Sequence, residues 1–133
     1  MKTIAILPSG SSDERGDLQA VEFPTHLPFI PVRMFFVRNV PIGSVRGGHA
    51  HRSCHQFLIA VRGKIEIEWD EVDRTHSSVL EAGSCGLYLP PLIWAKESYV
   101  SEGAVLGVLA SHPYDVGDYI DDRYSPELRR ADR

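Results

Sequence analysis

The sequence predicts an all-β domain, because short strand-like segments follow one another along most of the chain and no long helical pattern interrupts them. These segments are rich in β-branched or aromatic residues and cover residues 32–40, 55–63, 64–70, 74–80, 85–90, 93–100 and 104–110. Turn-forming residues separate them, namely Pro41 with Gly43, Arg62-Gly63, Glu81-Ala82-Gly83, Pro90-Pro91 and Ser101-Glu102-Gly103. Many short strands at close spacing are typical of a sandwich, a jelly roll or a barrel.

Two patterns indicate how individual strands meet the core. Residues 64–70 alternate, with the apolar side chains on one face and the charged side chains on the other: Ile65, Ile67 and Trp69 against Lys64, Glu66 and Glu68. Residues 57–61 and 104–110 are continuously apolar, which favours strands that are buried on both faces.

The C-terminal part lacks the strand pattern of the rest of the chain. Residues 125–130 predict a short helix, with Ser125 at the N-cap and Pro126 at the first helical position. Before it lies an acidic stretch, residues 115–122, which we expect to fold over the barrel mouth as a lid. In this interpretation Tyr114 and Tyr119 pack the lid down while its aspartates stay in water.

Length and composition indicate one domain, residues 1–133, with 43% hydrophobic and 24% charged residues. A net charge of -4 argues against nucleic acid as a partner. No segment has the apolar length of a membrane span, and the N-terminal residues lack the pattern of a secretory signal, so we expect a cytoplasmic protein without membrane partners. Cys54 and Cys85 fit a reducing compartment as free thiols, although the sequence leaves a disulfide between them open.

The stretch RGGHAHR, residues 46–52, carries the strongest functional signal. In a strand His49 and His51 point to the same face, where they could share a metal ion or a substrate proton, or pack as structural groups. The spacing from Gly43 to Gly63 resembles the first metal-binding motif of cupins, but Gln56 stands at the carboxylate position and no third histidine lies near Pro90. A neutral amide is a poor ligand, so the sequence predicts a barrel without a metal or other cofactor. Acid–base chemistry by the two imidazoles is then the favoured interpretation.

Several motifs together resemble the dTDP-sugar 3,4-ketoisomerases, also called FdtA-like or WxcM-like cupins. They are DERGDL (13–18), RGGHAHR (46–52), QFLIAVRG (56–63), GLYLPPLIW (86–94), VLASHPYD (108–115) and DYI (118–120). The resemblance implies a cupin jelly-roll barrel and a homodimer, often with strand exchange, that needs no metal. It implies a nucleotide-sugar substrate, expected to be dTDP-linked, whose carbonyl moves from C4 to C3 through an enediol. Such reactions belong to deoxysugar biosynthesis for lipopolysaccharide or other glycans.

The same resemblance assigns roles to individual residues. His51 is expected to be the catalytic base and His49 its neighbour in proton transfer or enediol stabilisation. The remaining candidates are expected to bind the substrate: Arg15, Arg46, Tyr88, Trp94 and Lys96. The two arginines suit pyrophosphate because a guanidinium donates two bonds at once. For Tyr88, which faces opposite to Leu87 and Leu89, a place on the outer surface of the barrel stays open.

The chain departs from the family pattern at two places. Phe35-Phe36 replaces a pair of tyrosines, so the ring is kept and the hydroxyl is lost, and Ala95 replaces a polar residue that is linked to the side of C4 reprotonation. The product epimer is therefore left open. The alternatives are a diverged sugar-nucleotide epimerase or isomerase, a non-catalytic sugar-nucleotide-binding cupin and, less expected, a metal-binding cupin.

Overall fold

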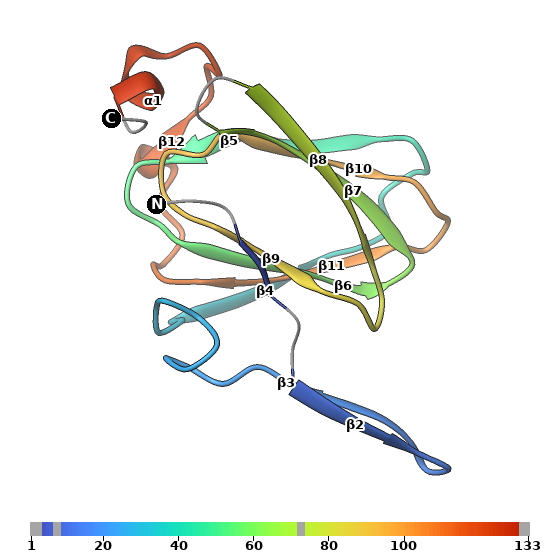
Figure 1. The fold of residues 1–133 in the computed structure, drawn as a ribbon. Coiled ribbons are helices and arrows are strands. Elements are labelled where there is room, and N and C mark those ends of the chain that lie inside the picture. Colours follow the sequence, from blue (N-terminus) through green and yellow to red (C-terminus); the bar gives the residue numbers. More distant parts are fainter. Residues whose placement is uncertain (1–3, 7–8, 72–73, 131–133) are drawn as a thin grey trace.

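The computed structural model describes residues 4–6, 9–71 and 74–130 and consists mainly of two five-stranded antiparallel sheets that face each other (Figure 1). The first sheet has the order β1 (Ile4–Ile6), β9 (Gly86–Leu89), β6 (Gln56–Arg62), β11 (Val105–Ala110) and β4 (Arg33–Val37). The second has the order β12 (Tyr119–Ile120), β5 (Val45–His51), β10 (Ala95–Tyr99), β7 (Lys64–Glu71) and β8 (Arg74–Glu81). This architecture confirms the predicted all-β jelly roll.

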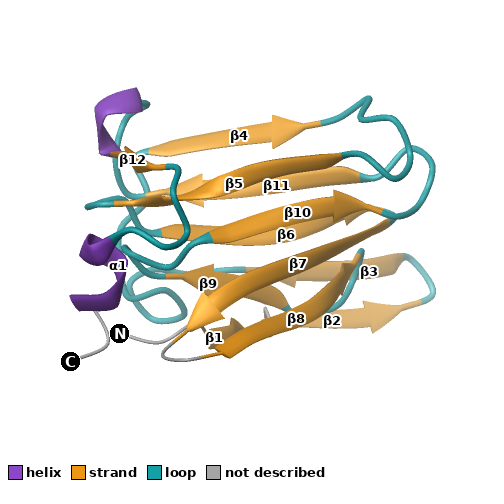
Figure 2. Cartoon of the chain, turned by 90° about the horizontal axis from the view of Figure 1, so that it is seen from above, coloured by secondary structure: helices purple, strands orange, loops and turns teal. Residues whose placement is uncertain are grey.

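Three smaller elements complete the fold. A separate hairpin of β2 (Ser9–Asp13) and β3 (Gly16–Ala20) projects away from the two sheets (Figure 1), toward the end opposite to β12 and α1 (Figure 2). At the other end, the 3-10 turn η1 (Val116–Asp118) leads into β12, and the helix α1 (Pro126–Arg130) follows. The predicted helix at 125–130 is confirmed, and the backbone N–H of Glu127 donates to the Ser125 hydroxyl at 3.3 Å.

The main core lies between the sheets and follows the predicted alternation. Ile65, Ile67 and Trp69 of β7 are buried there, together with residues of the facing strands such as Leu58 and Val108. The continuously apolar strands β6 and β11 have a second, outer face. The segment 21–31 packs over part of that face and forms a smaller apolar cluster with it. The cluster consists of Leu27, Phe29, Phe57 and Tyr88, with Val21, Ile59 and Leu109 packed against it.

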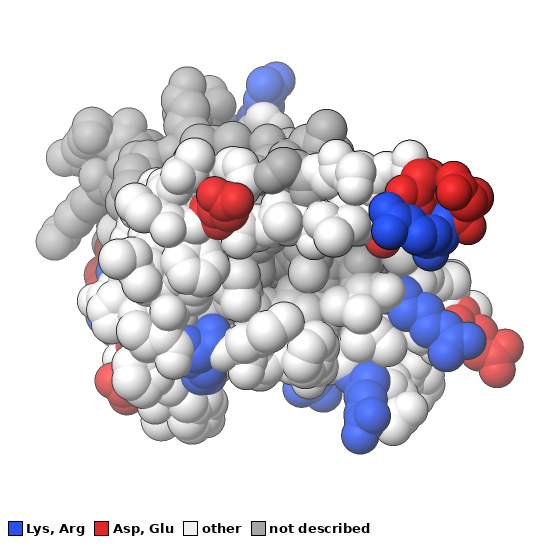
Figure 3. All heavy atoms as spheres, turned by 90° about the horizontal axis from the view of Figure 1, so that it is seen from below, with Lys and Arg blue, Asp and Glu red and all other residues white. Residues whose placement is uncertain are grey.

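The outer face of β4 remains uncovered in the single chain. Val32, Met34 and Phe36 are exposed there, and Val61 of β6 is exposed as well. Seen from below, this side of the molecule is largely free of charged side chains (Figure 3). The described residues include no helix that is long and apolar enough to cross a membrane.

Candidate active site

A β-bulge in β5 decides which side chains enter the barrel. Glu97 of β10 pairs with Arg46 and Ala95 pairs with His49, so β5 advances three residues while β10 advances two. The extra residue is accommodated at Gly47 and Gly48, whose φ angles of 78° and 79° are unfavourable for residues with a side chain. Because of the bulge, Arg46 points to the same side as His49, although strict alternation would place them on opposite faces.

The barrel contains a cavity of about 140 Å³. Its polar wall is formed chiefly by β5, β10 and β12, and its apolar wall by the first sheet. The lining residues that carry polar side chains are Arg46, His49, His51, Cys54, Gln56, Glu97 and Tyr119. Apolar side chains such as Phe35, Leu58 and Val108 close the other side. A small, half-enclosed space with a few convergent polar groups is typical of a ligand site.

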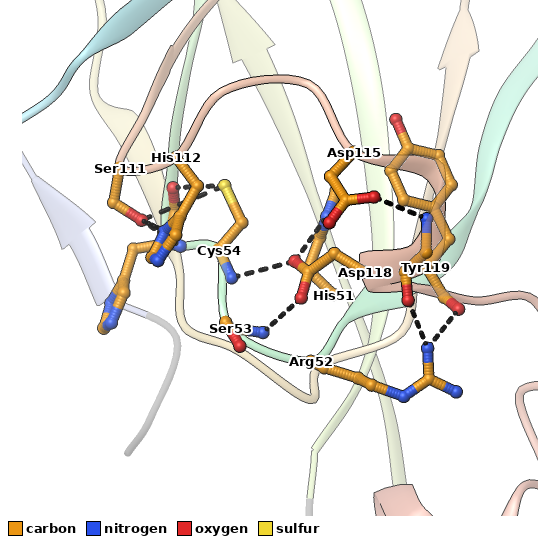
Figure 4. Close-up of polar contacts among 11 residues, drawn as sticks. His51, Arg52, Ser53, Cys54, Ser111, His112, Asp115, Asp118 and Tyr119 are labelled. Carbon is orange, nitrogen blue, oxygen red and sulfur yellow. Dashed lines mark hydrogen bonds and ion pairs between the residues drawn. The ribbon is translucent and has the colours of Figure 1, made fainter.

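His51 is held in one orientation by Asp118. Its Nδ1 lies 3.4 Å from Asp118 Oδ2, and the carboxylate also accepts backbone N–H groups from Ser53 at 2.9 Å and Cys54 at 3.1 Å (Figure 4). A carboxylate at Nδ1 favours the tautomer with its proton there, which leaves a lone pair on Nε2. Nε2 is buried and has no hydrogen-bond partner among the described residues.

Burial keeps both imidazoles in the neutral form. His51 is only 7% exposed, and burial, followed by the neighbouring His49, lowers its pKa to about 4. Burial also lowers the pKa of His49. The His49 ring stacks on Tyr119 with 4.2 Å between centroids, and the edge of His51 faces it at 5.0 Å. Two free-base imidazoles therefore lie side by side on the cavity wall.

The structure brings three of the predicted site residues together: Arg46, His49 and His51 line the cavity. Among the described residues there is no group of three or more His, Cys, Asp or Glu side chains that could hold a metal ion.

The other four predicted residues lie outside the cavity of their own chain. Tyr88 faces the outer cluster under the segment 21–31, where its hydroxyl lies 2.7 Å from His55 Nδ1. Trp94 faces the C-terminal segment, since its indole N–H donates to the carbonyl of Asp121 at 3.0 Å. Neither side chain is among the residues that line the cavity of this chain, and a role for either in substrate binding stays a prediction.

Lys96 and Arg15 are placed outside for different reasons. Lys96 alternates with the inward-facing Ala95 and pairs with Glu68 on the outer side of the second sheet at 3.5 Å. Arg15 lies on the projecting hairpin, is 85% exposed, and contacts Asp13 at 2.7 Å. Neither side chain is among the residues that line the cavity of this chain.

Sequence reasoning missed three polar residues of the site. Asp118 and Tyr119 were expected in a wet lid, but β12 pairs with β5 and sets Tyr119 directly opposite His51. Glu97 was not among the candidates. Its spacing of two from Ala95 was the available signal, because residues two apart in a strand share a face. Of the two phenylalanines, Phe35 lines the cavity and Phe36 is 56% exposed.

Asp118→Asn should destabilise the protein and weaken the site. An amide has one acceptor oxygen in place of two, so one of the N–H groups of Ser53 and Cys54, or His51 Nδ1–H, loses its partner. We expect a loss of about 1–3 kcal/mol in the free energy of unfolding, measured by urea denaturation. Asp115→Asn, which caps η1 in the same exposed segment, is the matched control. An Asp118 variant as stable as the control would contradict this role.

Comparison with known proteins finds relatives that are similar to this chain in sequence and in fold. The chain is 32% identical, over 108 residues, to the TDP-4-oxo-6-deoxy-alpha-D-glucose-3,4-oxoisomerase of Aneurinibacillus thermoaerophilus. The matched residues make up 81% of this chain and 78% of that protein. Two solved structures are similar along almost their whole length. One is a His-to-Asn variant of the 3,4-ketoisomerase QdtA from Thermoanaerobacterium thermosaccharolyticum in complex with TDP-4-keto-6-deoxyglucose (32% identity, 97% and 93% of the two chains, TM-score 0.87). The other is the TDP-quinovose 3,4-ketoisomerase WlaRB from Campylobacter jejuni (30% identity, 96% and 97%, TM-score 0.87).

A family model matches nearly the whole chain. The model is described as FdtA, WxcM-like, C-terminal, and it covers residues 1–126, which include both sheets, the histidine pair and the lid. The expected resemblance is thereby confirmed, and the chain belongs to the FdtA family of WxcM-like proteins.

Proposed function

We propose that this protein is a sugar-nucleotide 3,4-ketoisomerase, an enzyme that converts a TDP-linked 4-keto-6-deoxyhexose into the 3-keto isomer. The observation that carries the proposal is the pair of neutral imidazoles on the wall of a small cavity, one of them oriented by Asp118. The names of the relatives, a TDP-4-oxo-6-deoxyglucose 3,4-oxoisomerase and 3,4-ketoisomerases, point to the same reaction.

The chemistry requires a base for a carbon-bound proton. C3 of the substrate carries a hydrogen next to the C4 carbonyl, and its removal gives an enediol shared by both carbons. Nε2 of His51 has the free lone pair for this step, and His49 lies beside it for proton transfer or for a hydrogen bond to the enediol oxygen. Because burial disfavours the charged imidazole, the base is available at neutral pH.

We also propose that the reaction needs no metal. Gln56 lines the cavity where a metal-binding barrel would use a carboxylate, and Tyr119 is stacked on His49. Activity that survives extensive chelation would support this, and restoration by one divalent metal after chelation would contradict it.

A homodimer is proposed as the working form. The uncovered outer face of β4 offers Val32, Met34 and Phe36 as apolar contact surface. The hairpin of β2 and β3 projects far enough to lie against another subunit (Figure 1), which would give the exposed Arg15 a place near that subunit's nucleotide. Light scattering of the purified protein tests the dimer. A cytoplasmic location is proposed from the two cysteines, which are both free thiols.

The direct test is incubation with TDP-4-keto-6-deoxyglucose in D2O. We expect the C3 proton of the substrate to exchange with solvent and a 3-keto product to form, both followed by NMR. Tight binding of the sugar nucleotide with neither exchange nor product would favour a binding protein instead. Epimerisation with the keto group still at C4 would favour a diverged epimerase.

Arg46→Ala should weaken substrate binding more than the chemical step. Arg46 is exposed at the cavity mouth, so its guanidinium is placed to hold the phosphates while the sugar lies deeper. We expect KM to rise about 10- to 100-fold, the scale of a charge-assisted phosphate contact, with kcat changed much less. Arg74→Ala, on the exposed edge strand β8, is the control. An unchanged KM in the Arg46 variant would remove it from the substrate site.

A further inference from the structure

Glu97 places a carboxyl group in the same cavity as the two histidines. On β10 it shares the inward face with Ala95 and Tyr99, and the register sets it opposite Arg46, two pairs along the strands from the pair of Ala95 and His49. The wall therefore presents His51, His49 and then Glu97 in sequence. Among the described residues that line the cavity, Glu97 is the only carboxylic acid.

The bulge makes room for this carboxyl group. A Cβ atom on residue 47 would overlap Glu97 Oε2, so the carboxylate occupies space that only a glycine leaves open. The positive φ of Gly47 independently favours glycine at this position. One feature of β5 thus turns Arg46 inward and seats Glu97 against the backbone.

The surroundings of Glu97 favour its protonated form. The paired residue on β7 is Ile67, which is fully buried and apolar, and the next inward residue on β10 is Tyr99, whose buried hydroxyl has no hydrogen-bond partner among the described residues. On β5 it faces Arg46 and, further along, the neutral His49. Burial raises the pKa of Glu97 to about 7, and Arg46 offsets only part of that effect.

We propose that Glu97 is the catalytic acid of this site, the group that delivers a proton to C4 of the enediol while the histidines act as the base. This assignment rests on the proposed ketoisomerase function and extends it. Their environments shift the pKa values of the two kinds of group in opposite directions. The pKa values of both histidines are lowered, which keeps them as free bases, and the pKa of the Glu97 carboxyl is raised, so that it holds a proton near neutral pH. Opposite tuning of neighbouring groups is how acid and base roles are divided in many active sites. Phe35 and Ala95, the other inward positions considered for proton transfer, have no polar atoms.

The proton transfers balance within the site. The histidine pair takes the C3 proton, the electrons of that C–H bond form the C3–C4 double bond, and the same proton passes to the C4 oxygen. Glu97 then gives its proton to C4, the O–H bond of the C3 hydroxyl breaks as the C3 carbonyl forms, and the released proton returns to the Glu97 carboxylate. Each group ends the cycle in its starting protonation state, and no oxidant or reductant is needed.

Glu97→Gln separates this role from binding. The amide keeps the size of the side chain but delivers no proton, so we expect formation of the 3-keto product to fall about 100-fold or more. KM for TDP-4-keto-6-deoxyglucose should stay within about threefold, and exchange of the C3 proton in D2O should continue near the wild-type rate, since the first half-reaction uses the histidines. Glu97→Asp, which retains a carboxylic acid, should recover part of the lost product formation.

Glu66→Gln is the matched control, because it makes the same substitution on the exposed face of β7, outside the cavity. It should leave product formation and exchange unchanged. Three results for Glu97→Gln would overturn the proposal: wild-type product formation, equal loss of exchange and product, or a raised KM with normal kcat, which would make Glu97 a hydroxyl-binding residue. Wild-type protein that neither exchanges nor isomerises the sugar would overturn the ketoisomerase function itself, and the role of Glu97 with it.

Discussion

His51→Asn is expected to lower kcat for isomerisation by about 10²–10⁴-fold, the range over which a positioned general base contributes to a reaction. Asn cannot accept the C3 proton, but it is small enough to fit the buried site beside Asp118. Exchange of the C3 proton in D2O should fall in parallel with product formation, because proton abstraction comes first. Both rates can be read from the same NMR time course.

Two comparisons give this result its meaning. His49→Asn should cost less if His49 assists and as much if the two rings act as one unit. His112→Asn changes a histidine on the exposed side, where it contacts Ser111, and should leave both rates unchanged. Normal exchange in the His51 variant would show that another group is the base, and a matching loss in the His112 variant would indicate a general effect on folding.

The second large effect concerns stability and pH, and it follows from the opposite shifts of His51 and Glu97. Unfolding releases both groups to ordinary pKa values of 6.5 and 4.5. Between pH 4.5 and 7 the folded protein retains a proton on Glu97 that the unfolded chain gives up, so this group makes stability fall as pH rises. Between pH 6.5 and 4 His51 is protonated in the unfolded chain but stays neutral in the folded protein, so this group makes stability fall as pH falls.

Glu97→Gln should therefore be more stable than the wild type at pH 8, by up to about 3 kcal/mol, and about equal to it at pH 4.5. The wild type should show a flat profile between pH 4.5 and 6.5, since the two contributions oppose each other there, whereas the Gln variant should gain stability with rising pH. Urea denaturation at pH 4.5, 6 and 8 measures the difference directly. A variant that is no more stable at pH 8 would show that the carboxylate is well solvated in the folded protein.

The strands were predictable because their signal is local. The alternation of Ile65, Ile67 and Trp69 follows from the geometry of a single strand, and the structure repeats it. Tyr88 shows the limit of this reasoning. Alternation correctly sets it opposite to Leu87 and Leu89, but both faces of β9 are buried, so the pattern alone does not say which face meets the cavity.

The site was predictable only in part because two of its features depend on pairing between distant segments. Tyr119 and Asp118 reach His51 through the pairing of β12 with β5, across more than sixty residues of sequence. Motif reasoning found the histidines and Arg46, but it did not show what the two glycines between them do. A turn and a bulge look alike in sequence, and only the register against β10 distinguishes them.

That bulge makes strand length itself a determinant of what the cavity contains. Deleting one glycine of the pair would remove the bulge and leave Arg46 on the inward face, whereas inserting one residue between Arg46 and His49 with the bulge kept would turn Arg46 to the outside and bring Val45 and Gly47 to inward positions. The charge at the cavity mouth would change without replacing any residue that touches the ligand. For those who redesign such barrels for other sugar nucleotides, single-residue insertions at this point are a way to alter specificity that substitution scans do not sample.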